Sequence, residues 1–192
     1  MKRQLYRDWY SIVVYPHSEA INDVKALKDT LWSKIGWYAS RNSEAHITVI
    51  EFSADQYELD FYIRQLEKFC YSQKQQEVIF DQLSLSKFSN AIVLLPNNSS
   101  KPYLNDLLVR LRKRLKTSDT INGSGAHISI GRKLSPDQID RAESLYDYVN
   151  LRFNCDTIAI RKFNKNRGQF EVINKFKFLQ NPLVNSQCSL FS

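Results

Sequence analysis

The chain has 192 residues, of which 43% are apolar and 24% are charged, a composition typical of a globular protein. This length favours one domain or two closely packed halves, with a core that needs neither metals nor disulfides. No apolar run is long enough to cross a membrane, and residues 1–8 lack the apolar segment of a secretory signal. We therefore expect a cytoplasmic protein that does not insert into membranes.

The 27 basic and 20 acidic side chains give a net charge of +7, and the positive charge lies mainly in the second half of the chain. Residues 101–117 and 152–177 each carry a net charge of +5, whereas residues 44–81 carry −5. A positive region suits a partner that carries phosphate. A solvated helix face and a solvated edge strand would produce the same charge pattern.

The three cysteines, Cys70, Cys155 and Cys188, are widely spaced, and no Cys-x-x-Cys sequence occurs. Neither a disulfide framework nor a zinc site is indicated, and a reducing compartment is the simplest interpretation.

Apolar patterns predict alternating strands and helices in the first half. A β-branched run predicts a strand, and apolar residues repeating every three or four positions predict a helix. In order, we expect a strand at 11–15, a helix capped by Ser18, a strand at 46–52, a helix around 59–69 and a strand at 78–85.

The second half repeats this order. After a turn at 87–90 we expect a strand at 91–95, a helix at 104–115, a loop at 117–125, a strand at 127–130 and a helix from 135 to 149. Two final strands, about 151–163 and 169–178, are joined by a turn at 164–168, and residues 181–192 form a loosely held tail.

This order reads as two β-α-β-α-β halves followed by one last strand, with no linker between the halves. It predicts an α+β fold with two lobes, largely antiparallel sheets, helices on the outside and a central cleft. We expect residues 1–192 to form a single two-lobed domain whose lobes are not independent.

Two of the three histidines lie in nearly identical pentapeptides: residues 45–49 read Ala-His-Ile-Thr-Val and residues 126–130 read Ala-His-Ile-Ser-Ile. Because strand side chains alternate, each histidine shares a face with the hydroxyl two residues later, about 6.5–7 Å along the strand. The isoleucines and valine would face the core. If the two strands are equivalent in the two halves, one cleft holds two imidazoles and two hydroxyls.

Two histidines in one cleft suit general acid–base catalysis, because one imidazole can be neutral while the other is protonated. The hydroxyls would donate hydrogen bonds to the non-bridging oxygens of a phosphate. This chemistry requires no metal.

The sequences around His46 and His127 resemble the paired motifs of the two-histidine phosphoesterase superfamily, in particular its RNA 2'-5' ligase-like branch, over about residues 9–180. The resemblance implies a bilobal fold that acts without cofactors on 2',3'-cyclic phosphates or 2'-5' phosphodiesters. It also implies that His46 and His127 are the acid and base, and that Thr48 and Ser129 hold the phosphate. Many members have proline at the position of Ala45.

Three further residues are candidates for substrate binding. Arg132 follows the second motif and could contact phosphate. Arg161 and its neighbour Lys162 lie on opposite faces of a strand, and alternation does not decide which one faces the cleft. Tyr15 is a candidate to stack on a base, although core packing explains it as well. His17 could join the other two histidines as a metal ligand, but no acidic cluster supports a metal site.

The sequence thus predicts a metal-independent, monomeric phosphodiesterase that acts on RNA ends or small nucleotides with a 2',3'-cyclic phosphate. The alternatives are an RNA 2'-5' ligase or 2'-5' phosphodiesterase, a non-catalytic module that binds RNA ends, and a metal-dependent hydrolase.

Overall fold

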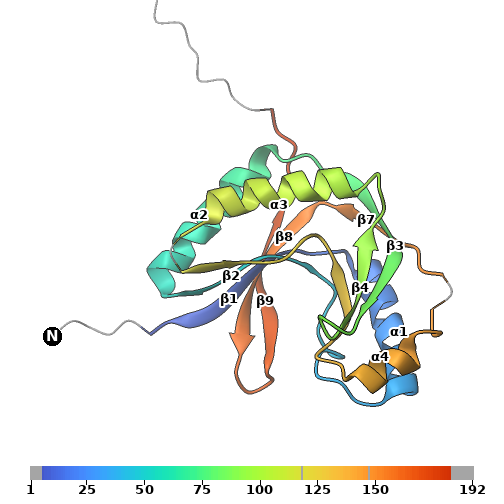
Figure 1. Cartoon of the computed structure of the whole chain (residues 1–192). Coiled ribbons are helices and arrows are strands. Elements are labelled where there is room, and N and C mark those ends of the chain that lie inside the picture. Colours follow the sequence, from blue (N-terminus) through green and yellow to red (C-terminus); the bar gives the residue numbers. More distant parts are fainter. Residues whose placement is uncertain (1–5, 118, 147, 183–192) are drawn as a thin grey trace, which may run out of the picture.

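The computed structural model of the chain describes residues 6–117, 119–146 and 148–182 (Figure 1). Most of the tail expected at 181–192 therefore lies outside the described residues. In chain order the elements are β1 (Asp8–Val14), α1 (Ser18–Ile35), β2 (Ile47–Ala54), α2 (Gln56–Ser72), β3 (Gln76–Ser86), β4 (Ala91–Pro96), α3 (Lys101–Leu115), β5 (Thr120–Asn122), β6 (Ile128–Arg132), α4 (Pro136–Ala142), β7 (Leu151–Cys155), β8 (Thr157–Asn164) and β9 (Gln169–Lys177).

The strands form two antiparallel sheets, one with the order β5-β2-β1-β8-β9 and one with the order β6-β4-β3-β7. Helices α2 and α3 pack against each other on the first sheet, where α2 contacts β2 and β9 and α3 contacts β2. Helix α1 packs on β6 and β7 of the second sheet, with α4 beside it (Figure 1). The predicted α+β fold with two lobes is confirmed.

The two halves of the sequence exchange strands. Strand β3, the last strand of the first half, pairs with β4 and β7, whereas β8 from the second half pairs with β1. Each sheet therefore needs strands from both halves of the chain. We infer that the lobes fold as one unit.

The strand predicted at 151–163 is in fact two strands that belong to different sheets. Strand β7 pairs with β3, the chain turns at Asp156, and β8 then pairs with β1 and β9. The carbonyl of Asp156 accepts a hydrogen bond from the Phe178 N–H at 2.8 Å, which fixes the crossing point. Both strands are rich in apolar residues, so the sequence pattern continues through the break.

The helix predicted to reach Val149 ends at Ala142. The Leu145 N–H already bonds to the Ala142 carbonyl in a tight turn. Val149 is buried and Leu145 and Tyr146 pack against the same core, so their spacing reflects core contact in an irregular segment.

Two smaller expectations are also wrong. Strand β5 lies inside the predicted loop at 117–125 and pairs with β2. The N-cap of α1 is His17 rather than Ser18, because the His17 Nδ1 accepts the hydrogen bond from the Ala20 N–H at 3.4 Å.

Cys70 and Cys155 are buried free thiols, and Cys188 lies outside the described residues. Within the described ranges, none of the helices has the length and apolar character needed to span a bilayer.

The segment after β5 lies directly against β2. The Gly123 N–H donates a hydrogen bond to the Val49 carbonyl at 2.9 Å. A Cβ atom on Gly123 would overlap the carbonyl oxygen of Thr48, whereas a Cβ on Gly125 would meet no atom within 4 Å. Glycine at 123 therefore permits the close approach of this segment to β2.

We expect Gly123→Ala to lower the free energy of unfolding by about 1–3 kcal/mol, the usual cost of overpacking a tight contact. Gly125→Ala is the matched control and should unfold almost like the wild type. Denaturant unfolding curves of the three proteins test this, and equal stability of both variants would contradict the close approach.

Candidate active site

Both predicted motifs lie at strand starts, one in each sheet. His46 directly precedes β2 and His127 directly precedes β6. A cleft of about 250 Å³ brings together all four predicted polar residues, His46, Thr48, His127 and Ser129. Two segments that are 81 positions apart in the sequence thus face one space.

The residues between them point away from the cleft. Ile47, Val49, Ile128 and Ile130 are fully buried in the core. The alternation of the two pentapeptides therefore separates a core face from a cleft face in both strands.

The two imidazoles are held by equivalent hydrogen bonds. The His46 Nδ1 lies 2.6 Å from the carbonyl oxygen of Glu44, and the His127 Nδ1 lies 2.9 Å from that of Gly125. A carbonyl oxygen can only accept, so each Nδ1 carries the hydrogen and donates it. The Nε2 of each ring is then left for a ligand in the cleft.

His46 lies beside a buried cation. The Arg161 Nη1 is 3.1 Å from the His46 Nδ1, while the Arg161 Nε donates a hydrogen bond to the Ser11 hydroxyl at 3.0 Å. Because this Nδ1 already donates to a carbonyl, the guanidinium is a close positive charge rather than a hydrogen-bond partner of the ring. Burial, and next the charge of Arg161, hold the pKa of His46 well below 6.5, so His46 is neutral at pH 7.

His127 has different neighbours. Besides the Gly125 carbonyl, its Nδ1 lies 3.3 Å from the Ser124 hydroxyl. Both contacts are neutral oxygen atoms. The two histidines thus share a backbone arrangement but differ in the charge next to them.

A matching bulge occurs in β2 and β6. The register with the neighbouring strand shifts so that Val49 and Ile130 are extra residues in the two strands. The shift turns Glu51 and Arg132, each five residues after its histidine, onto the cleft face.

Sequence reasoning missed Glu51, because strict alternation would place Ile50 there. The equal spacing of Glu51 and Arg132 from the two histidines was the signal that could have found it. The predicted candidate Arg132 does line the cleft.

The structure places Arg161, and not Lys162, beside the histidines. Lys162 lies on the other face of β8 and forms an ion pair with Asp8 at 2.5 Å. The burial of Arg161 lowers its pKa to about 10, which leaves it charged at neutral pH.

Tyr15 is not among the residues that line the cleft. Its ring is buried beneath the ammonium of Lys175, and its hydroxyl donates a hydrogen bond to the Glu44 carboxylate at 2.8 Å. In this position it supports the segment whose carbonyl holds His46, and it has no free face on which a base could stack.

The third histidine, His17, packs edge-on against Phe153 and caps α1. In the part of the chain that the structure describes, no group of three or more His, Cys, Asp or Glu side chains is arranged to hold a metal ion.

Arg112 on α3 is a second residue that sequence reasoning missed. Its Nε donates to the Val49 carbonyl at 3.0 Å, and its Nη2 donates to the Ser124 carbonyl at 2.7 Å. It thereby fixes the segment before His127 against β2. Nothing in the sequence distinguishes Arg112 from the other basic residues of this helix.

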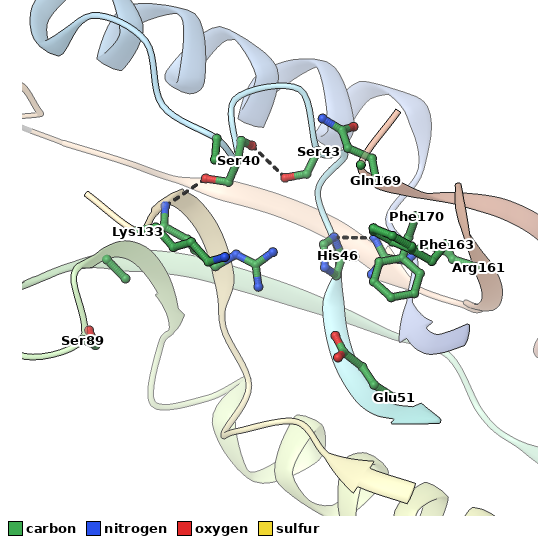
Figure 2. Close-up of a pocket in the computed structure, with 14 residues that line it drawn as sticks. Ser40, Ser43, His46, Glu51, Ser89, Lys133, Arg161, Phe163, Gln169 and Phe170 are labelled. Atoms are coloured by element: carbon green, nitrogen blue, oxygen red, sulfur yellow. Dashed lines mark hydrogen bonds between the residues drawn. The ribbon is translucent and has the colours of Figure 1, made fainter. Parts of the chain in front are cut away.

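A second cavity of about 470 Å³ adjoins the cleft on the His46 side (Figure 2). Its walls come from the segment before β2, the end of β6 and the β8–β9 hairpin. A third cavity, of about 400 Å³, lies on the His127 side and is lined largely by residues of β4 and of the segment before β6.

The comparisons with known proteins agree with this architecture. Escherichia coli LigT in complex with 3'-AMP is similar over 91% of this chain and 100% of its own, with 11% identity and a TM-score of 0.68. TT0787 of Thermus thermophilus is similar over 89% and 98% of the two chains, with 12% identity and a TM-score of 0.59. Kluyveromyces marxianus Usb1 is similar over 88% and 98%, with 11% identity and a TM-score of 0.52. At these identities the likeness shows the fold alone.

A search of curated protein sequences gave no match. The family model of the 2'-5' RNA ligase superfamily, in contrast, matches residues 10–167, which is most of the chain and includes both histidine motifs. The chain therefore belongs to the 2'-5' RNA ligase superfamily.

Proposed function

We propose that this protein is a metal-independent phosphodiesterase that opens 2',3'-cyclic phosphates, or cleaves 2'-5' linkages, of RNA ends or nucleotides. The observation that carries the proposal is the pair of Nδ1–H bonds to main-chain carbonyls, which leaves the Nε2 of both His46 and His127 for one cleft. Two imidazoles on one phosphate can remove one proton and supply another in the same step.

His46 is the general base, because its lowered pKa keeps it neutral. Its Nε2 takes a proton from a water molecule as that water attacks the phosphorus. The bond from phosphorus to one ribose oxygen breaks, and the Nε2 of protonated His127 gives its proton to that oxygen. One water is consumed, and the products are a phosphomonoester and a free ribose hydroxyl.

Thr48 and Ser129 would donate hydrogen bonds to the non-bridging oxygens, where negative charge develops in the transition state. The guanidinium of Arg132, which lines the same cleft, would neutralise part of that charge. The solved structures of LigT contain 3'-AMP, ATP and NADP+, which favours a nucleotide as the ligand of this fold.

The same groups could catalyse the reverse reaction, so RNA 2'-5' ligation is the alternative enzymatic activity. A module that binds RNA ends without turnover is the alternative from another class.

A screen of 2',3'-cyclic nucleotides and of oligoribonucleotides ending in a cyclic phosphate tests the proposal. We expect turnover that is unchanged by a metal chelator, with a 2'- or 3'-phosphate as product. Binding without turnover would favour the RNA-end-binding module, and loss of activity with chelator would favour a metal-dependent hydrolase.

We expect His46→Ala and His127→Ala each to lower turnover about 10²–10⁴-fold, the usual contribution of a positioned proton-transfer group. The double variant should lose little more than the worse single variant, because the two act as one unit. Thr48→Ala and Ser129→Ala should each cost about 1.5–3 kcal/mol, the scale of a hydrogen bond to a charged group. Steady-state hydrolysis of a cyclic nucleotide measures all of these effects.

His17→Asn is the matched control for these variants, because asparagine also caps helices and His17 lies outside the cleft. It should keep wild-type turnover. A folded His46→Ala or His127→Ala protein with wild-type turnover would refute the paired mechanism.

The pH profile tests which histidine is the base. The kcat/KM should fall as pH decreases through the pKa of His46, and this acidic limb should lie below pH 6.5 because burial and Arg161 disfavour the charged ring. Arg161→Met removes the positive charge, so the limb should move to higher pH, even though overall activity decreases. Lys162→Met, on the opposite face of the same strand, should leave the limb in place. An acidic limb that is identical in Arg161→Met and wild type would argue against His46 as the base.

A further inference from the structure

The second cavity, on the His46 side of the cleft, combines positive charge with an aromatic wall. Its volume of about 470 Å³ falls within the range of about 300–1,000 Å³ that is typical of small-molecule sites. Figure 2 shows Lys133 and Arg161 on opposite sides of it, with His46 between them. Phe163 and Phe170 lie next to Arg161.

Two cations in or behind this cavity are buried. Arg161 is 5% exposed and Lys28 is 1% exposed. The Lys28 ammonium donates to the Ser43 carbonyl at 2.6 Å, the Ser43 hydroxyl at 2.9 Å and the Ser40 carbonyl at 3.2 Å. Lys28 thus holds the serine-containing wall of the cavity from behind.

The cations repel one another. After burial, the charges of Arg132 and Arg161 contribute to lowering the pKa of Lys28 to about 8, and Arg132 also disfavours the charged form of Arg161. At Arg161 the attraction of Glu51 outweighs the repulsion from Arg132, whereas at Lys28 the charges of both arginines act in the same direction as burial. A bound anion would relieve the repulsion on Lys28, and with Arg132 and Lys133 in its wall the cavity is electrostatically suited to a phosphate group.

The cavity is continuous with the catalytic cleft, because His46, Glu51 and Arg132 line both. A phosphate between the two histidines therefore has a second cationic site beside it. The rings of Phe163 and Phe170 meet edge to face at 5.2 Å and supply a surface of the kind on which nucleobases stack.

We propose that the second cavity binds the nucleoside that carries the cyclic phosphate together with a further phosphate on its 5' oxygen. This inference rests on the proposed function and narrows its substrate. The preferred substrates are then RNA ends and 5'-phosphorylated nucleotides, and 5'-hydroxyl nucleoside cyclic phosphates are poor substrates. Lys133 contacts the 5'-phosphate, Arg132 lies between the two phosphate positions, and the buried Arg161 adds positive charge beside the aromatic wall.

Calorimetric titration with product analogues tests the subsite without turnover. Adenosine 3',5'-bisphosphate should bind about tenfold to a hundredfold more tightly than adenosine 3'-phosphate, as expected for one added charge-assisted contact. Lys133→Gln should reduce this ratio several-fold, and Lys133→Glu should reduce it further. Lys165→Gln removes the same charge from a lysine that lies over Tyr6, outside this cavity, and should preserve the ratio.

Equal affinities for the two analogues, or a ratio that Lys133→Glu leaves unchanged, would overturn the inference. Uridine analogues run in parallel remove any effect of base preference. A folded state is checked by thermal melting, and Lys133 is exposed, so its replacement should not disturb the core.

Kinetics then separate the two sources of a 5'-phosphate. We expect both a 5'-phosphorylated adenosine 2',3'-cyclic phosphate and an ApA dinucleotide 2',3'-cyclic phosphate to show higher kcat/KM than the 5'-hydroxyl nucleoside. A preference for the monoester would indicate nucleotides, and a preference for the dinucleotide would indicate RNA ends. If none of the three is turned over, the proposed function fails, while the binding ratio still decides whether the subsite exists.

Discussion

Two main-chain carbonyl oxygens, those of Glu44 and Gly125, determine which nitrogen of each imidazole is available to a ligand in the cleft. If either ring carried its hydrogen on Nε2 instead, it would lose both its anchor and its free nitrogen on the cleft side. Neighbouring side chains hold the two segments that carry these carbonyls. Tyr15 bonds to the Glu44 side chain, and Arg112 bonds to the Ser124 carbonyl beside Gly125. The chemistry of the cleft therefore depends on two short segments that are held from behind.

The segment before β2, which contains Ser40, Ser43 and Glu44, also holds positive charge next to the neutral imidazole of His46. A buried ammonium is costly unless its hydrogens are accepted, and Lys28 meets this requirement with three oxygens from Ser40 and Ser43. The Nε of Arg161 likewise donates a hydrogen bond to the Ser11 hydroxyl. Because these bonds fix the cations without neutralising them, the field at His46 remains positive. Together with burial, which has the larger effect, that field lowers the pKa of His46 and keeps the ring unprotonated, and the same field would attract an anion.

Local rules were enough to predict the histidine pair, because strand alternation places a side chain on a face regardless of the strand's partner. Features that depend on which strands pair with each other could not be predicted from the sequence. The break at Asp156 exists because β7 and β8 pair in different sheets, and no local pattern marks it. Glu51 reaches the cleft only through a bulge defined by pairing with β1. Alternation left Arg161 and Lys162 as equal candidates for the cleft face, and only the packing of the β1–β8 pair decides between them.

A repeated motif alone would give two equivalent histidines, whereas acid–base catalysis needs two different ones. The difference arises from residues that the repeat does not share. A guanidinium lies beside His46, and a serine hydroxyl lies at the same nitrogen of His127. Equivalent bulges also present a carboxylate at Glu51 and a guanidinium at Arg132. In the mechanism that we propose, the matching parts of the halves would place the reacting groups, and the parts that do not match would give the proton transfer its direction.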